Sequence, residues 1–368
     1  MKAYVICVVS TLLLDLLAEY LLKKNKKRIG CTVLVISMLV LCIIAGVRDI
    51  TVGTDVRGYV MRLVSVAQEK NFITYMLNPN SHALFGIIVY VGYLFRDINF
   101  LLFFIEVAVC LPVYIYAYKE RNDSSLALIL STFVMTMYCT SYNLIRQSMA
   151  ISILILAYQY FKNEEKKKSY ILVFMAALIH ITSLAFCAVF VMYNIVKKKS
   201  EKKYVYILET FLVISLLSFF SEQIIGVTSF DYYIDNANYM REWSIGSILK
   251  QLFWVAIAIF TFLNVTKNKK LRGKRVVDAE LSIYLFVFSL MLIFMSFSIP
   301  GMGRLGYYFY DLAIIITIPN LLRIAKPKWI MFVLLNILLF YLWWHMTCVP
   351  NDSAGIYPYT SNLVHFLN

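Results

Sequence analysis

The chain has 368 residues, of which 61% are hydrophobic and 15% charged, and its mean hydropathy is +0.73. This composition excludes a soluble domain and predicts an all-α polytopic membrane protein, a bundle of transmembrane helices. The net charge of +14 does not indicate nucleic acid, because most of the 35 Lys and Arg residues lie in short segments between apolar runs. There they set topology and contact membrane lipids. The seven cysteines include no CxxC pair and support neither a metal site nor a redox site.

Ten apolar segments are long enough to cross a bilayer, which takes about 20 residues. The predicted spans are residues 3–22, 29–47, 99–118, 124–141, 142–161, 204–221, 247–266, 279–298, 305–322 and 329–346. Threading them so that the densest basic loops share one side groups residues 23–28, 119–121, 162–168, 197–203, 267–275 and 323–328. Since cytoplasmic loops are rich in Lys and Arg, that side is predicted to be the cytoplasm, with both chain termini outside. Residues 1–368 are interpreted as one membrane domain with outer loops at 48–82 and 222–246.

Two further apolar segments have lengths that do not fit one upright crossing. Residues 83–95 are too few, and residues 170–196 are too many and have basic loops on both sides. Both fit if the first is re-entrant and the second is a hairpin of two short helices, with His180, Thr182 and Ser183 at its apex. One long tilted helix with His180 buried is the alternative for the second segment.

The first candidate site is the sequence RDITVGTDVRGY at residues 48–59, which begins the outer loop. It combines two guanidinium groups, two carboxylates and a phenol, those of Arg48, Arg57, Asp49, Asp55 and Tyr59. Such a set can bind a diphosphate and sugar hydroxyls while one carboxylate acts as a general base. A solvated loop with weak local ion pairs is the alternative.

The second candidate site opens an apolar helix at residues 142–150, YNLIRQSMA. Asn143, Arg146 and Gln147 are spaced three and four residues apart, so they are predicted to share one helix face. An arginine at the centre of a membrane helix costs about 2.5–3.5 kcal/mol, so this face should contact protein or water. The alternative is a structural Arg146 bound to backbone carbonyls or to a carboxylate such as Asp235.

A third candidate lies in PGMGRLGY at residues 300–307, where glycines and Arg304 begin a helix. Exposed N–H groups at a helix start and a neighbouring guanidinium suit an anion. An ordinary turn with Arg304 in solvent is the alternative. In the outer loop 222–246, Arg241 lies among acidic and aromatic residues, a composition typical both of sugar stacking and of an interfacial aromatic belt.

The segments RDITVGTDVRGY and YNLIRQSMAISILILA, with HITS at residues 180–183, resemble the EpsG and Wzy-like polysaccharide polymerases of bacteria. The resemblance covers most of the chain, and the Arg304 turn and the tail at residues 357–359 support it more weakly. It implies an integral-membrane glycosyltransferase of the GT-C type. Such enzymes join polyprenyl-diphosphate-linked oligosaccharide repeat units at the outer face of the cytoplasmic membrane, into capsule, exopolysaccharide or O-antigen. The resemblance leaves open whether a chain-length regulator is a further partner.

In such an enzyme, Arg146 and Arg304 are expected to bind the diphosphate and stabilise the negative charge that develops as it leaves. Arg48 or Arg241 would complete this basic cluster. A cluster of this kind can neutralise the leaving group without a metal ion, so no cofactor is expected.

The other predicted residues act on the acceptor sugar and on orientation. Asp55 or His180 is expected to remove the proton of the acceptor hydroxyl. Asn143 and Gln147 are expected to orient sugar or phosphate oxygens. Asp49 and Asp55 leave a role for Mg²⁺ open.

Three other functions bear comparison with a polymerase. A flippase for lipid-linked oligosaccharide should show two related halves, and the sequence shows no such repeat. A membrane O-acyltransferase would need a reactive histidine early in the chain, and the first two spans contain none. A polysaccharide ligase would bind the same diphosphate, so the sequence leaves this alternative open.

Overall fold

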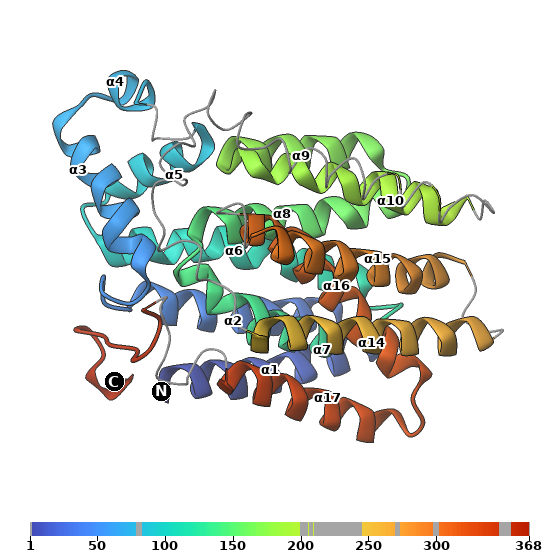
Figure 1. Cartoon of the computed structure of the whole chain (residues 1–368). Coiled ribbons are helices and arrows are strands. Elements are labelled where there is room, and N and C mark those ends of the chain that lie inside the picture. The colour runs from blue at the N-terminus through green and yellow to red at the C-terminus, as the bar shows by residue number, and fades with distance from the viewer. Residues whose placement is uncertain are drawn as a thin grey trace. The chain divides into compact units, whose positions relative to one another are not determined.

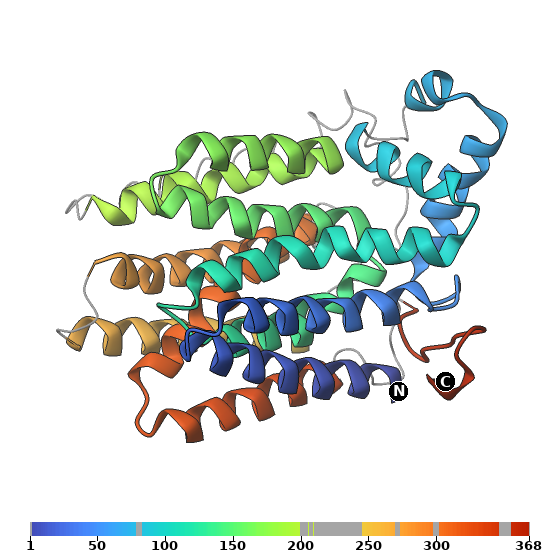
Figure 2. The same ribbon diagram turned by 180° about the vertical axis from the view of Figure 1, so that it is seen from behind.

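The computed structural model of the chain describes residues 2–78, 83–198, 205, 209, 245–268, 273–296, 302–345 and 355–367. Every regular element in these ranges is a helix, as Figures 1 and 2 show from opposite sides. The helices form two compact units, Met1–Leu184 with Lys326–Asn368, and Ala185–Ala325. The prediction of one membrane domain is not tested by this division and stays a prediction.

Helices of very different lengths build the first unit. They are α1 (Lys2–Lys23), α2 (Lys27–Gly46), η1 (Val56–Val60), α3 (Met61–Glu69), α4 (Phe72–Met76), α5 (Ala83–Leu94), α6 (Ile98–Glu120), α7 (Leu126–Phe133), η2 (Val134–Tyr138), η3 (Thr140–Tyr142), α8 (Ile145–Lys162), α9 (Lys166–Ile179) and α17 (Lys328–Trp343). The second unit contains α10 (Cys187–Lys197), α14 (Ile245–Lys267), α15 (Lys274–Met295) and α16 (Met302–Ile324).

Within the described part of the chain, six helices are long and apolar enough to cross a membrane: α1, α2, α6, α14, α15 and α16. The predicted all-α class and multi-pass character are confirmed. Other predicted spans are shorter: the apolar helices Leu126–Tyr138 and Lys328–Trp343 have fewer than 18 residues. The span at 204–221 lies almost entirely outside the described residues, and the count of ten full spans stays a prediction.

The outer region at residues 48–82 is not the plain loop that the sequence predicted, because it holds η1, α3 and α4. Only Leu63 and Ala67 are buried on α3, which is the pattern of a helix that presents one narrow apolar face. Such short amphipathic helices are not predicted from hydropathy over membrane-length segments, because they are too short and only partly apolar. The following segment, α5, is one unbroken apolar helix of 12 residues, and its re-entrant path stays a prediction.

The segment at residues 170–196 is broken at His180, as predicted. Helix α9 ends at Ile179, and His180 is extended, with φ −152° and ψ 107°. A 3₁₀ helix, η4 (Ile181–Phe186), then leads into α10. The alternative of one long tilted helix is therefore wrong.

Contacts within the first unit gather three basic loops at one end. Lys162 Nζ binds Glu120 Oε1 at 2.6 Å and so joins the ends of α8 and α6. The Ser125 hydroxyl donates to Glu19 Oε2 at 2.7 Å and so joins the start of α7 to the end of α1. Residues 23–28, 119–121 and 162–168 therefore share one end, which confirms the predicted grouping for these loops.

Both described chain ends lie at the opposite end of this unit (Figure 1). Tyr4, near the start of α1, donates its hydroxyl to the Ile356 carbonyl at 2.6 Å. Rings of Tyr4 and Tyr359 also meet edge to face, 5.5 Å apart. The two termini are thus on one side, as predicted, and the assignment of that side to the cell exterior stays a prediction.

Within the second unit, taken by itself, the ends of three helices meet. Val265 near the end of α14 and Ala279 near the start of α15 form a buried contact, against which Ile324 at the end of α16 packs. The basic residues Lys267, Lys274 and Arg323 therefore share one end of this unit. Arg304, in the first turn of α16, lies about 30 Å away along this helix.

Candidate functional site

The loop after α2 runs alongside the turn that precedes α8. Gly53 has φ +88°, and a Cβ atom at this position would lie 2.2 Å from the carbonyl oxygen of Tyr142. Only glycine permits so close an approach. The next residue along, Thr54, donates its hydroxyl to the side chain of Asn143. The two segments are thus held in a fixed register.

Asp55 continues this register and binds the start of α8. Its Oδ2 accepts a hydrogen bond from the Ile145 backbone N–H at 3.2 Å. A carboxylate at a helix N-terminus is stabilised by the helix dipole. Because Ile145 directly precedes Arg146, residues 48–59, which we call the acidic loop, and the start of α8 at Arg146 form one site. They were two separate candidates in the sequence.

Arg146 lies flat on an aromatic ring in this site. Its guanidinium carbon is 3.8 Å from the centre of the Tyr59 ring, which in turn packs against Phe85 of α5. Arg146 Nη1 is buried and makes no hydrogen bond to the described residues. A guanidinium stacked by its face keeps its N–H edge directed toward an acceptor, so this arrangement suits a phosphate oxygen.

His180 lies level with Arg146 on the neighbouring helix. Helices α8 and α9 run antiparallel, and the Ser169 hydroxyl donates to the Ala157 carbonyl at 2.9 Å. His180 is eleven residues beyond Ser169, and Arg146 is eleven residues before Ala157. Since both helices rise by about 1.5 Å per residue, the two side chains start at the same height.

The prediction that Asn143, Arg146 and Gln147 share one helix face is wrong for Asn143. The 3₁₀ turn η3 ends at Tyr142, and Leu144 leaves the helical conformation, with φ −106° and ψ 55°. Asn143 therefore precedes α8 and is half-buried, whereas Gln147 is buried within its first turn. Polar side chains in this stretch compete for backbone hydrogen bonds, which favours a turn over a continuous helix.

Two other predicted loop residues differ from one another in their surroundings. Arg57, on η1, is exposed. The Asp49 carboxylate accepts a hydrogen bond from Asn362 Nδ2 at 2.8 Å and thereby joins the loop to the C-terminal tail.

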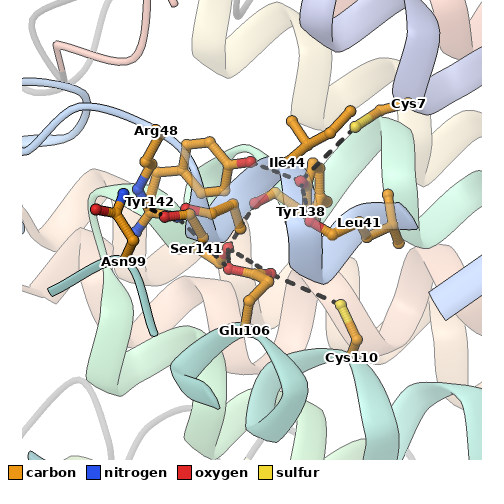
Figure 3. Close-up of polar contacts among 12 residues, drawn as sticks. Cys7, Leu41, Ile44, Arg48, Asn99, Glu106, Cys110, Tyr138, Ser141 and Tyr142 are labelled. Carbon is orange, nitrogen blue, oxygen red and sulfur yellow. Dashed lines mark hydrogen bonds and ion pairs between the residues drawn. The ribbon is translucent and has the colours of Figure 1, made fainter. Parts of the chain in front are cut away.

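Arg48 is fully buried, although the sequence suggested that it faces substrate. Its guanidinium carbon lies 3.9 Å from the centre of the Tyr142 ring, and Nη1 donates to the Ala45 carbonyl at 3.1 Å. Glu106 Oε2 of α6 is 4.0 Å from the same nitrogen. Figure 3 shows these groups close together. Such contacts are those of a structural residue beneath the site, and a role of Arg48 in diphosphate binding stays a prediction.

Glu106 is the centre of this buried polar cluster and was missed in the sequence. The Ser141 hydroxyl lies 3.1 Å from both carboxylate oxygens, and Cys110 Sγ lies 3.7 Å from Oε1. Beside it, the hydroxyls of Tyr138 and Tyr142 are 2.5 Å apart (Figure 3). The available signal was a lone carboxylate within a predicted span, since such residues are rare in membranes and need a partner.

The C-terminal tail packs onto the acidic loop. Gly53 donates its N–H to the Gly355 carbonyl at 2.8 Å, and Tyr359 donates its hydroxyl to the Ile44 carbonyl at 2.7 Å. Burial raises the pKa of the Tyr359 hydroxyl above its ordinary value, so it remains a neutral donor. The tail thereby also holds this loop in place.

The second unit contains one predicted site residue that the structure describes. Arg304 is half-buried at the start of α16, whereas Arg241 and Asp235 lie outside the described residues. The same unit holds two charges that the sequence did not single out: Lys250 Nζ, 4.9 Å from the centre of the Tyr310 ring, and the buried Asp311.

The described residues contain no cluster of side chains suited to binding a metal ion. No group of three His, Cys, Asp or Glu side chains there could hold an ion. The expectation that no metal or other cofactor takes part stays a prediction.

Comparison with known proteins gives one match. The model of the EpsG family matches residues 31–361, which include the whole of the candidate site in the first unit. Comparisons with curated proteins and with solved structures give no match.

Proposed function

The chain belongs to the EpsG family, and from this premise we propose that it polymerises oligosaccharide repeat units carried on a polyprenyl diphosphate. The membership confirms the resemblance seen in the motifs and identifies a multi-pass membrane protein of polysaccharide biosynthesis. The proposed place of reaction is the outer face of the bacterial cytoplasmic membrane, at the helix ends opposite the basic loops. The proposed product is a capsular polysaccharide, an exopolysaccharide or an O-antigen.

One observation carries this proposal: the stacked guanidinium of Arg146, whose buried Nη1 makes no hydrogen bond to the described residues. A buried cationic donor is costly unless an acceptor binds it. Within the membrane region a diphosphate supplies such an acceptor, with several anionic oxygens. The helix N–H groups at the start of α8 add positive potential at the same place.

The proposed reaction is a substitution at the anomeric carbon of the sugar attached to the diphosphate. The oxygen of an acceptor hydroxyl forms a bond to that carbon, and the bond between the carbon and the diphosphate oxygen breaks. The polyprenyl diphosphate leaves with the bonding electron pair, and Arg146 stabilises the charge that develops on it. The hydroxyl proton passes to a general base of the protein.

Two side chains of the first unit are candidates for this base. Asp55 accepts the N–H of Ile145, the residue before Arg146, and His180, the residue after α9, lies level with Arg146. Asp55 already accepts the Ile145 N–H, which lowers its availability as a proton acceptor. We therefore propose His180 as the base and Asp55 as the residue that fixes the loop to α8.

The experiment is polymerisation in proteoliposomes that contain the cognate lipid-linked repeat unit. We expect wild type to give a ladder of products and Arg146→Ala to give none at equal folding. Arg121→Ala is the matched control, because Arg121 also stacks on a tyrosine ring, that of Tyr118, at 3.8 Å, but at the end with the basic loops. It should keep the ladder.

The same assay separates the remaining alternatives. Loss of the ladder with His180→Ala but not with Asp55→Asn would assign the base, and Arg304→Ala tests its predicted role. A well-folded wild type that forms no ladder but transfers finished polymer to a second acceptor would be a ligase. Movement of the lipid-linked unit across the bilayer without bond formation would make it a flippase.

A further inference from the structure

Glu106 is a carboxylate inside an apolar, membrane-length helix. It is the ninth residue of α6, about 12 Å from the start of this helix, and only 1% of it is exposed. An ionisable group at such a position is expensive and needs a reason to be there. None of the motifs that suggest the function includes it.

The Glu106 carboxylate lies against two segments at once. One is the acidic loop, whose first residue, Arg48, lies 4.0 Å from Oε2. The other is the turn before α8, whose Ser141 hydroxyl lies 3.1 Å from both oxygens and also donates to the Tyr138 carbonyl at 2.6 Å. Figure 3 shows Glu106 rising from α6 toward Ser141, with Arg48 and Tyr142 next to it.

Both segments lead within a few residues to the candidate site. Asp55 is seven positions after Arg48, and Arg146 is five positions after Ser141. The acidic loop and the turn before α8 are also joined to each other by the close approach of Gly53 to the Tyr142 carbonyl. A shift of either anchor would therefore move Asp55 and Arg146 relative to each other.

We propose that Glu106 is a positioning residue, whose buried carboxylate sets the placement of the acidic loop against the start of α8 through Arg48 and Ser141. This inference rests on the proposed function, since that function requires the loop and Arg146 to face one substrate. Stability alone does not require this pair of charges. A buried ion pair replaced by apolar side chains of similar volume is often no less stable.

The geometry of the pair supports positioning over packing. Arg48 Nε and Nη2 make no hydrogen bond to the described residues, and the Arg48 to Glu106 distance exceeds that of a hydrogen bond. A pair optimised for stability would be shorter and fully hydrogen-bonded. At the other end of the same helix, Glu120 and Lys162 form such a pair at 2.6 Å.

The test compares Glu106→Gln with Glu120→Gln, which changes the second pair on α6. Structure is measured apart from activity, by the rate at which a short thiol-reactive cross-linker joins cysteines at positions 54 and 143. A protease site inserted after Asn78 lets the cross-link be scored on a gel, because uncross-linked chains fall into two fragments. The chain without the two added cysteines is the control for cross-linking through native cysteines.

We expect Glu106→Gln to slow cross-linking at least tenfold and to lower polymer yield by a similar factor, while Glu120→Gln changes neither. Ser141→Ala, which removes one of the two anchors and leaves both charges in place, should give a partial effect in the same direction. Ser141→Ala also provides the test if Glu106→Gln does not fold.

Two results would overturn the proposal. One is wild-type cross-linking in Glu106→Gln, or, if that variant does not fold, in Ser141→Ala. The other is slowed cross-linking with unchanged polymer yield. If wild type makes no polymer, the proposed function fails, whereas the cross-linking rates still decide whether Glu106 sets the register of the two segments.

Discussion

Helix α6 carries two buried carboxylates, Glu106 in its N-terminal half and Glu120 at its C-terminal end, and the two are bound very differently. Glu120 is 2.6 Å from Lys162, with both side chains 7% exposed. Glu106 is 4.0 Å from Arg48, and two of the three guanidinium nitrogens make no hydrogen bond to the described residues. The same helix therefore holds a well-satisfied pair at the end with the basic loops and a loosely satisfied one at the end with the candidate site.

The difference between the two pairs shows where buried polar groups of this unit lack hydrogen bonds. Native proteins satisfy nearly all buried polar groups, and exceptions gather at functional sites. Arg146, whose Nη1 also makes no hydrogen bond to the described residues, lies at the same end as Arg48. We interpret the Glu120–Lys162 pair as a contact that stabilises the helix bundle, and the arrangement around Arg48 and Arg146 as one that favours an incoming anion.

The largest expected effect comes from breaking the looser pair. Arg48→Ala leaves Glu106 buried without its cation, and we expect a loss of about 3–5 kcal/mol in the free energy of unfolding. The combined change of Arg48→Met and Glu106→Leu should restore most of this stability but not the polymer yield. Thermal unfolding in detergent and the proteoliposome assay measure the two quantities. A double variant that is both stable and active would show that the pair only fills space.

Gly53→Ala tests the contact that the looser pair supports. The new Cβ would collide with the Tyr142 carbonyl at an unfavourable φ, which costs about 1–3 kcal/mol from the backbone and a similar amount from overpacking. Gly273→Ala is the control, because Gly273 has φ +81° and no described residue has an atom within 4 Å of its Cβ position. We expect polymer yield to fall only for Gly53→Ala. Equal loss in both variants would point to backbone strain rather than to the contact.

Local patterns made much of this architecture predictable, whereas its long-range contacts were not. Hydropathy and charge placed α1, α2 and α6, and helix length pointed to the break at His180. Glu106 escaped notice because its meaning depends on Arg48, which is 58 residues away and reaches it only in the folded chain. The docking of the tail was equally invisible, since Asn362 and Asp49 are 313 positions apart.

A smaller effect on function is expected at the well-satisfied pair of Glu120 and Lys162. Glu120→Ala removes a short charge-assisted hydrogen bond and leaves Lys162 buried without its anion, so we expect the free energy of unfolding to fall by about 3 kcal/mol. Polymer yield per folded molecule should stay at the wild-type level, because no part of the candidate site lies at this end. A selective loss of activity would mean that the two ends are coupled through α6.

The smallest effect is expected from Asn362→Ala in the tail. Its side chain donates to Asp49 at 2.8 Å in an exposed position, so its loss should change stability by about 0.5 kcal/mol or less. The loop keeps its backbone bond to the tail, from the Asp49 N–H to the Thr360 carbonyl at 2.8 Å. Polymer yield should therefore fall less than twofold in the proteoliposome assay. A tenfold loss at unchanged thermal stability would instead assign Asp49 and Asn362 to the substrate, and the candidate site would then extend from α8 across the loop to the tail.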